Sequence, residues 1–382
     1  MKVYLDNAAT TMVDPRVVKA MLPFFSEKFG NPSSLHRFGR EAKKALERAR
    51  AVIAKKINAD PSEIIFTSGG TESDNLAIRG IAYANRHLGN HIITSKIEHP
   101  AVLRTCNSLM EEGFEVTFLD VDEEGFVDLK ALEKSITKKT ILVSIMHANN
   151  EIGTIQPIEK IGRICKKHRV YFHTDAVQSF TKVPIDVRKM NIDLLSISSH
   201  KIHGPKGVGA LFVRKGVKIK PEITGGSHES GLRAGTENVP GIVGFAKAVE
   251  LSSDDDIRKM SKLRDRLISG LLKIKDSKLN GPRGKKRLCN NVNIGFRGVE
   301  GESLMMYLDT KGIAVSTGSA CANLLEEGGT SHVLQAISKD LEFATGSIRL
   351  SLSRFMTERE IDYTIESVRG IVKHLRRISG FE

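Results

Sequence analysis

The sequence predicts an α/β fold, with a mainly parallel seven-stranded sheet in a large domain and a smaller α+β domain after it. The first reason is size, because a chain of 382 residues with 40% hydrophobic side chains is longer than a single core usually serves. The second is a series of short β-rich runs between residues 63 and 213. The third is that helix-length segments separate most of these runs, and strands that alternate with helices pair in parallel through right-handed crossovers.

The elements follow one another in a regular order. Residues 40–57 place Ala42, Leu46 and Ile53 at helical spacing among charged residues, which predicts an amphipathic helix. The seven strands are expected at 63–67, 91–95, 115–119, 140–146, 170–173, 194–198 and 208–213. Helices are expected at 72–87, 100–112, 158–168 and 184–190. A ligand of such a sheet binds at the carboxyl ends of the strands.

The pattern changes after Ala246. A charged helical stretch continues to residue 275, a Gly-, Pro- and Lys-rich break follows at 280–287, and a strand is expected at 291–296 before a helix at 358–377. We therefore expect a large domain at 15–250 and a small α+β domain made of 1–14 and 251–382.

Composition limits the partners and the compartment. Lys and Arg exceed Asp and Glu by 58 − 45 = 13, which favours anionic partners. Aromatic residues make up 5% of the chain and there is no Trp, so direct nucleic-acid binding is not expected. The four cysteines are widely spaced and are read as reduced thiols. Asp6 interrupts the N-terminus before any signal core, and no charge-free run approaches the ~18 residues of a membrane span, so we expect a cytoplasmic protein without membrane contact.

Three strand ends carry residues suited to chemistry. The Gly-rich turn at 68–72 follows one strand and opens a helix, so Gly70 and Thr71 could bind an anion with backbone N–H groups and a hydroxyl. Asp175 ends a second strand, where its carboxylate could meet a cationic ring nitrogen, with Gln178 close by. Lys201 follows a third strand, where partial desolvation suits Schiff-base chemistry.

Taken singly, each of these features has a plainer explanation. The Gly-rich turn could be only structural, Asp175 could cap a helix, and Lys201 could be an exposed lysine in a turn. Taken together, an anion cradle, a carboxylate and a lysine are what a protein contributes to a pyridoxal phosphate enzyme.

At this point the chain resembles the class V aminotransferases, a family of fold-type I pyridoxal phosphate enzymes, and within it the cysteine desulfurases of the NifS/IscS type. The resemblance runs essentially from end to end. The matching segments are 4–11, 29–34, 67–75, 98–99, 147–153, 198–209, 231–236 and 316–321.

The resemblance implies a role for each of the candidate site residues. Lys201 would hold the cofactor as an imine, Asp175 would keep the ring nitrogen protonated, and His99 would stack on the ring and move protons. The remaining contacts would come from Gly70, Thr71, Ser198 and His200 at the phosphate, Thr236 from the other subunit of a homodimer, Gln178 at the ring hydroxyl, Asn150 at cofactor and substrate, and Arg349 at the substrate carboxylate.

Cys321 is the residue that distinguishes a desulfurase from the transaminases of the family. It ends the segment 316–321 and enters a Gly- and Glu-bearing stretch. The resemblance implies that its thiolate takes sulfur from L-cysteine, releases L-alanine and passes the persulfide to an iron–sulfur scaffold protein or another acceptor. Cys321 could also ligate a transient iron–sulfur cluster. The alternative on the same scaffold is a selenocysteine lyase or an aminotransferase, and transamination does not need Cys321.

Overall fold

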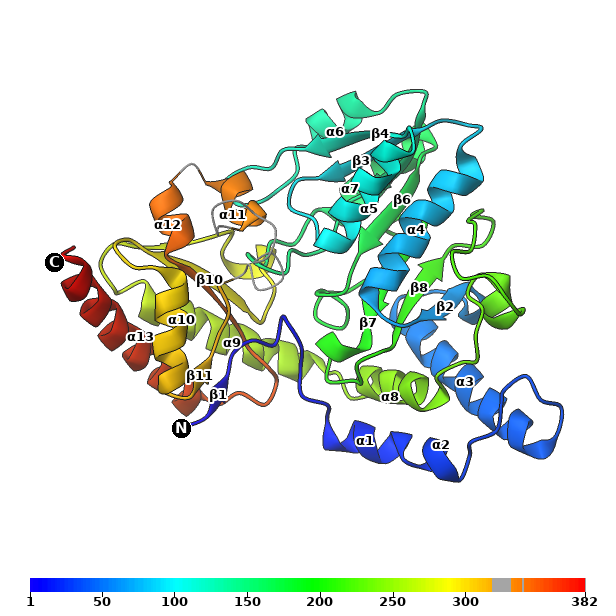
Figure 1. Cartoon of the computed structure of the whole chain (residues 1–382), viewed down its shortest axis with the longest axis horizontal. Coiled ribbons are helices and arrows are strands. Elements are labelled where there is room, and N and C mark those ends of the chain that lie inside the picture. Colours follow the sequence, from blue (N-terminus) through cyan, green and yellow to red (C-terminus); the bar gives the residue numbers. More distant parts are fainter. Residues whose placement is uncertain (318–330, 339, 382) are drawn as a thin grey trace.

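The computed structural model describes residues 1–317, 331–338 and 340–381, and there the chain forms two units side by side (Figure 1). The larger unit is built on a seven-stranded sheet in the order β2-β8-β7-β6-β5-β3-β4. Its strands are β2 (Ile64–Thr67), β3 (His91–Ser95), β4 (Glu115–Leu119), β5 (Thr140–Ser144), β6 (Tyr171–Asp175), β7 (Leu194–Ser198) and β8 (Gly209–Val213). Only β8 runs antiparallel to its neighbours, β7 and β2. The predicted α/β fold class is confirmed.

Helices cover both faces of this sheet, because alternate strand residues enter different apolar clusters. Ile64 and Phe66 of β2 belong to one cluster, whereas Ile65 between them belongs to the other. The first cluster includes residues of α1 (Pro15–Met21), α3 (Arg37–Lys56), α6 (Leu129–Ser135), α7 (Ile158–His168) and α8 (Val239–Glu250). The second includes residues of α4 (Gly70–Asn85) and α5 (Pro100–Glu111).

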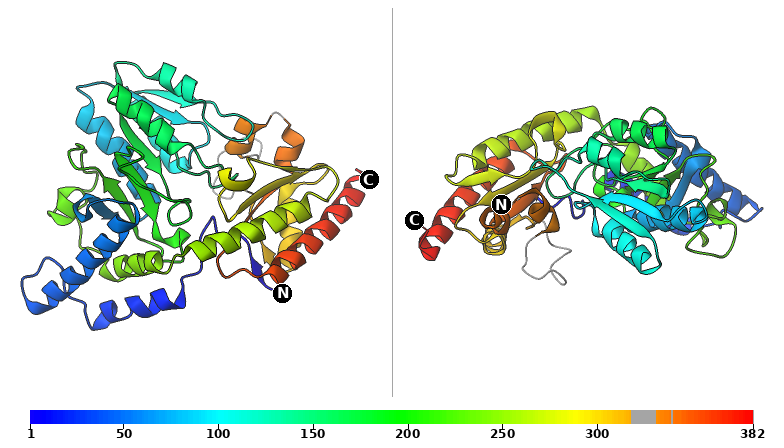
Figure 2. Two further views of the ribbon diagram at one scale, coloured as in Figure 1. Left: turned by 180° about the vertical axis from the view of Figure 1, so that it is seen from behind. Right: turned by 90° about the horizontal axis from the view of Figure 1, so that it is seen from above.

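The smaller unit joins the two ends of the chain, which lie on the same side of the molecule (Figure 2). One apolar cluster holds Val3 and Leu5 together with residues between 263 and 372. Its sheets are β12-β10-β9 and the parallel pair β1-β11. The elements are β1 (Val3–Tyr4), α9 (Asp254–Leu271), β9 (Ser277–Leu279), β10 (Asn291–Phe296), α10 (Gly301–Thr310), β11 (Ile313–Ala314), α11 (His332–Ile337), α12 (Leu341–Thr345), β12 (Ser347–Ser351) and α13 (Glu358–Ser379). The domain bounds given above stay a prediction.

The helix expected at 184–190 is wrong. Residues 184–186 have no regular structure, and 187–190 form a single turn closed by a hydrogen bond of 2.9 Å from the Met190 N–H to the Asp186 carbonyl oxygen. Asn191 follows in the left-handed conformation, with a φ of 53°, which ends the turn before a helix can form. Across the described residues, no helix has the length and apolar character needed to cross a membrane.

An ion pair connects the two units near the point where the chain passes from the smaller unit into the larger one. Asp14 lies at the start of α1, and its Oδ2 is 2.5 Å from Nη2 of Arg354, with exposed side-chain fractions of 1% and 7%. We expect Asp14→Ala to lower the free energy of unfolding by about 3–5 kcal/mol, because it leaves the buried Arg354 with only the more distant carboxylate of Asp256, at 4.0 Å. Denaturant unfolding of the purified protein measures this loss. Asp255→Ala breaks an exposed pair with Arg258 and should cost less than about 1 kcal/mol. Equal losses in the two variants would contradict the prediction.

Candidate active site

A cavity of about 350 Å³ lies at the carboxyl ends of the strands, where the larger unit meets the smaller one. Thr236 is exposed and does not line it, and Cys321 lies outside the described residues. The predicted site residues that line it are Gly70, Thr71, His99, Asn150, Asp175, Gln178, Ser198, His200, Lys201 and Arg349. The structure thus brings together residues that are far apart in the sequence.

One wall of the cavity is suited to an anion. Gly69 precedes α4 and supplies no side chain to cap its first N–H groups, and Thr71 lines the cavity one residue after the helix begins. A Cβ at Gly70 would lie 2.7 Å from Cγ2 of Val177, so only glycine allows this close approach. A helix start with N–H groups directed outwards binds phosphate or carboxylate. Ser198 and His200 line the same cavity.

Lys201 ends a short 3₁₀ turn, Ser199–Lys201, directly after β7. Its Nζ donates hydrogen bonds to the backbone oxygens of Ala8 at 2.5 Å and Ala9 at 2.7 Å. A second lysine supports this turn, because Nζ of Lys182 donates to the Lys201 carbonyl oxygen at 3.2 Å. Burial lowers the pKa of Lys182 to about 8. The Lys201 amine is therefore held within the cavity.

Asp175 lies at the end of β6 and is 6% exposed. Its Oδ1 accepts a hydrogen bond from the Val177 N–H at 2.8 Å. Burial raises the pKa of Asp175 to about 6, against opposing effects of this hydrogen bond and of the charge on Lys201. A buried carboxylate of this kind can pair with a cationic ring nitrogen.

Asp74 is a second buried carboxyl group in the cavity, and the sequence reasoning missed it. It is 1% exposed, its Oδ1 lies 3.6 Å from Nε2 of His173, and that oxygen has no hydrogen-bond partner among the described residues. Burial, followed by the charge of Asp175, raises the pKa of Asp74 well above its ordinary value. Asp74 lies beyond the first turn of α4, in which Glu72 is the acidic residue, and the sequence reasoning gave it no role of its own.

His99 caps α5, and its Nδ1 accepts a hydrogen bond from the Ala101 N–H at 3.1 Å. Burial and the nearby charge of Lys201 lower the pKa of His99 to about 4. The ring is neutral at pH 7 and carries its proton on Nε2. It can therefore lie against an uncharged or cationic group without repulsion and can accept or donate a proton when its surroundings change.

The buried histidines make stability depend on pH. His147 is 2% exposed, and burial lowers its pKa to about 4, against about 6.5 in an unfolded chain. Between these values the unfolded state binds a proton that the folded state does not, so the free energy of unfolding rises with pH over this window and falls on acidification. We expect His147→Gln to reduce by about one the difference in bound protons between the unfolded and the folded state. The free energy of unfolding of the variant should therefore rise less steeply with pH. Urea unfolding from pH 4.5 to 6.5 measures it, and an unchanged slope would contradict the prediction.

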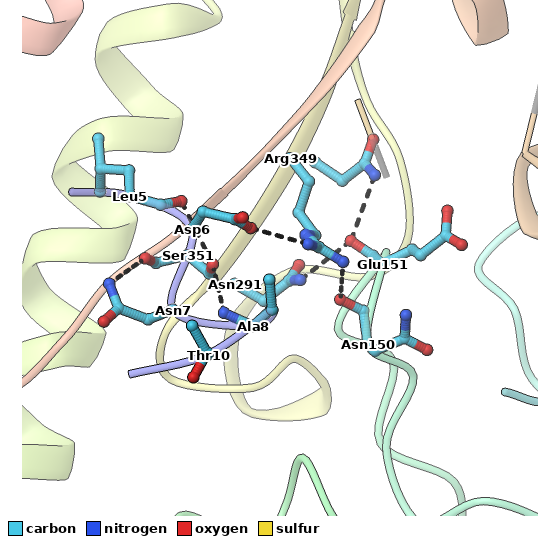
Figure 3. A network of polar contacts seen from close by, with 12 residues as sticks. Leu5, Asp6, Asn7, Ala8, Thr10, Asn150, Glu151, Asn291, Arg349 and Ser351 are labelled. Carbon is cyan, nitrogen blue, oxygen red and sulfur yellow. Dashed lines mark hydrogen bonds and ion pairs between the residues drawn. The ribbon is translucent and has the colours of Figure 1, made fainter. Parts of the chain in front are cut away.

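Arg349 lies on β12 and is 4% exposed. Figure 3 shows the network around it: Nη2 donates to Oδ1 of Asp6 at 2.9 Å, and Nη1 donates to the Asn150 carbonyl oxygen at 3.4 Å. Its Nε has no hydrogen-bond partner among the described residues. A buried guanidinium with an unused donor at the edge of a cavity is suited to a carboxylate.

The sequence reasoning also missed residues that join the two units at this cavity. The Ala8 carbonyl oxygen accepts from Nε2 of Gln178 at 2.9 Å in addition to Lys201. Oε2 of Glu151 accepts from the Ser331 hydroxyl at 2.5 Å. Nε2 of His332 lies 3.0 Å from the Glu98 carbonyl oxygen. These contacts depend on the packing of the two units, which a sequence pattern does not encode.

The family model of the class-V aminotransferases matches residues 3–364, and the chain belongs to this family. It is 54% identical over 385 residues to the cysteine desulfurase IscS of Dictyoglomus turgidum, covering all of this chain and 97% of that protein. The solved structure of a NifS-like protein superposes with a TM-score of 0.92 at 44% identity, covering 98% of this chain and all of that one. A structure of SspA in complex with cysteine gives 0.83 at 39% identity, covering 93% and 100%. The resemblance to the NifS/IscS cysteine desulfurases is confirmed.

Proposed function

We propose that this protein is a cysteine desulfurase that uses pyridoxal 5′-phosphate to take sulfur from L-cysteine. The main observation in support is that Lys201, Asp175 and Arg349 line one cavity beside the start of α4. An amine, a carboxylate and a guanidinium in these positions fit the aldehyde and ring of the cofactor and the carboxylate of an amino acid. Relatives named cysteine desulfurase and a neighbour solved with cysteine support the choice of substrate.

The residues present fit the cofactor. The uncapped start of α4 with Thr71, Ser198 and His200 would hold its phosphate, Lys201 its aldehyde carbon and Asp175 its ring nitrogen. His99 would lie against the ring, Gln178 would reach the ring hydroxyl, and Asn150 would orient cofactor and substrate. When bound, the cofactor supplies a sink for the electron pair left on the substrate carbon.

The chain's own residues supply the rest of the chemistry. Arg349 binds the substrate carboxylate and fixes its orientation. The Lys201 amine moves the α-proton, and the carbonyl oxygens of Ala8 and Ala9 stabilise it when it carries a positive charge. His99, neutral at pH 7, accepts or donates a proton beside the substrate.

Cys321 is proposed as the nucleophile. Its thiolate attacks the sulfur of L-cysteine, the bond from that sulfur to Cβ breaks, and the carbon skeleton takes up a proton and leaves as L-alanine. The sulfur remains on Cys321 as a persulfide for an iron–sulfur scaffold protein or another acceptor. The described residues on either side of 318–330 support this role: Ser316 pairs with Arg349 of the cavity through backbone hydrogen bonds of 3.1 and 2.6 Å, and His332 lines the cavity. Ligation of a transient cluster by Cys321 is part of the same proposal.

A homodimer and a cytoplasmic location complete the proposal. Thr236 is exposed outside the cavity, as a residue that serves the other subunit would be. Apolar side chains near the N-terminus are also exposed, among them Phe25 at 62% and Leu35 at 88%. Cys106, Cys165 and Cys289 are free and buried, in keeping with a reducing compartment.

The test is to measure L-alanine and sulfide formed from L-cysteine by the purified protein in the presence of a reductant. A desulfurase gives the two products in equal amounts. Selenocysteine replaces L-cysteine in a parallel assay, and a strong preference for it would favour the lyase. Formation of a keto acid without sulfide would favour an aminotransferase. Either of these two results would contradict the proposal.

A further inference from the structure

We propose that Asp6 sets the affinity of the active site for carboxylates by keeping Arg349 partly neutralised, so that the product can leave. This inference rests on the proposed function, in which Arg349 binds the carboxylate of an amino acid. The pair is close and mostly enclosed: Oδ1 of Asp6 lies 2.9 Å from Nη2, and the exposed side-chain fractions are 20% for Asp6 and 5% for Arg349.

The backbone fixes Asp6 beside the strand that carries Arg349. The Ser351 N–H donates to the Leu5 carbonyl oxygen at 2.6 Å, and the Asn7 N–H donates to the Ser351 carbonyl oxygen at 3.3 Å. The Ala8 N–H donates to the Ser351 hydroxyl at 2.7 Å. Residues on both sides of Asp6 are thus bound to β12 (Figure 3). The carboxylate therefore stays next to the guanidinium when a ligand arrives.

Arg349 retains donors for a ligand while Asp6 stays in place. A guanidinium has five N–H groups. Of these, Asp6 and the Asn150 carbonyl oxygen each take one, and Nε has no hydrogen-bond partner within the described parts of the chain. A substrate carboxylate can therefore bind, but it meets an ion pair instead of a full positive charge, and it lies near a second carboxylate.

This arrangement matters because substrate and product carry the same carboxylate. L-cysteine and L-alanine would bind Arg349 in the same way, so an unopposed guanidinium would strengthen both complexes. Tighter binding of substrate and product alike does not speed the chemical step. It slows product release, which limits turnover in many enzymes. A fixed counter-charge weakens both complexes and preserves the geometry of the clamp.

The experiment uses Asp6→Asn in the cofactor-loaded protein. Asparagine has the same shape, and its Oδ1 can still accept from Arg349, so the charge is the main change. We measure the dissociation constant of L-alanine by calorimetry, and inhibition by propionate, which lacks an amine and reports on the guanidinium. We expect both ligands to bind about tenfold more tightly, because removing a like charge at this range shifts an ionised group by about one log unit or more. If Asp6→Asn does not fold, Asp6→Ser carries the same test.

The matched control is Asp14→Asn. It removes a buried carboxylate charge from the same N-terminal segment, where Asp14 pairs with Arg354 and Arg16, and none of these residues lines the active-site cavity. L-alanine affinity should stay within twofold of that of the parent protein. Unchanged or weaker binding in Asp6→Asn would overturn the inference, and so would equal tightening in the control. Failure of the parent protein to bind L-alanine at all would instead overturn the proposed function, and the inference with it.

Discussion

Lys201→Ala should lower L-alanine formation from L-cysteine by about ten-thousand-fold or more, because the substitution removes the amine that both holds the cofactor and moves the α-proton. The visible absorption of the purified protein should also change, since no amine at this position remains to bind the cofactor aldehyde. The 3₁₀ turn Ser199–Lys201 should survive, because Lys182 binds the backbone carbonyl oxygen of residue 201, which the substitution leaves in place.

The control for this variant is Lys206→Ala. Lys206 is exposed and does not line the cavity, so its loss should leave both absorption and turnover close to those of the parent protein. Far-ultraviolet circular dichroism establishes that both variants are folded. Turnover by folded Lys201→Ala within tenfold of the parent would exclude Lys201 from the proposed role.

Cys321→Ala should have the second large effect, a loss of sulfide and L-alanine formation of about a thousand-fold or more, with the visible absorption of the cofactor retained. The substitution removes the acceptor of the substrate sulfur but none of the residues that line the described cavity. Assays at matched cofactor occupancy compare the two products in the variant and the parent protein.

Cys165→Ala is the matched control for this second substitution. Cys165 lies on α7 and is 1% exposed, and burial raises the pKa of its thiol, which keeps it protonated and unreactive at neutral pH. Its loss should leave turnover intact. Activity that survives in Cys321→Ala but is lost in Cys165→Ala would show that Cys165, and not Cys321, accepts the sulfur.

Much of the larger unit could be predicted from the sequence, because local periodicity determines where its elements form. The helix at 158–168 and the strands at 91–95, 115–119 and 194–198 coincide with the structure. The turn at 187–190 could not be recognised, since the left-handed conformation of Asn191 that ends it does not alter the helical periodicity of the sequence. In the smaller unit, the sequence pattern did not reveal β12, which joins the three-stranded sheet by pairing with β10.

The same distinction applies to the site. Residues that follow strands and form recognisable motifs, such as Thr71, Asp175 and Lys201, were predicted and line one cavity. Asp74 lines that cavity and Asp6 adjoins it, but the sequence around these two residues does not indicate their roles. Their importance comes from contacts with Arg349 and His173, which are distant in the sequence. Physical reasoning on a sequence finds groups whose chemistry is local and misses groups that act by charge across the fold.

The pairing of Val3 with Ile313 has a consequence for how the molecule is made. The first strand has no partner until more than three hundred further residues have been synthesised, so during translation the N-terminal segment must wait while the larger sheet forms. The loop that closes this pairing spans most of the chain, and contacts of such long range form late and slowly. The oxygens of Ala8 and Ala9 reach Lys201 from a segment that also binds the larger unit, since the backbone of Thr11 bonds to His200. Arg349 lies on β12, the last strand, so a nascent chain cannot present the finished cavity before that strand emerges from the ribosome.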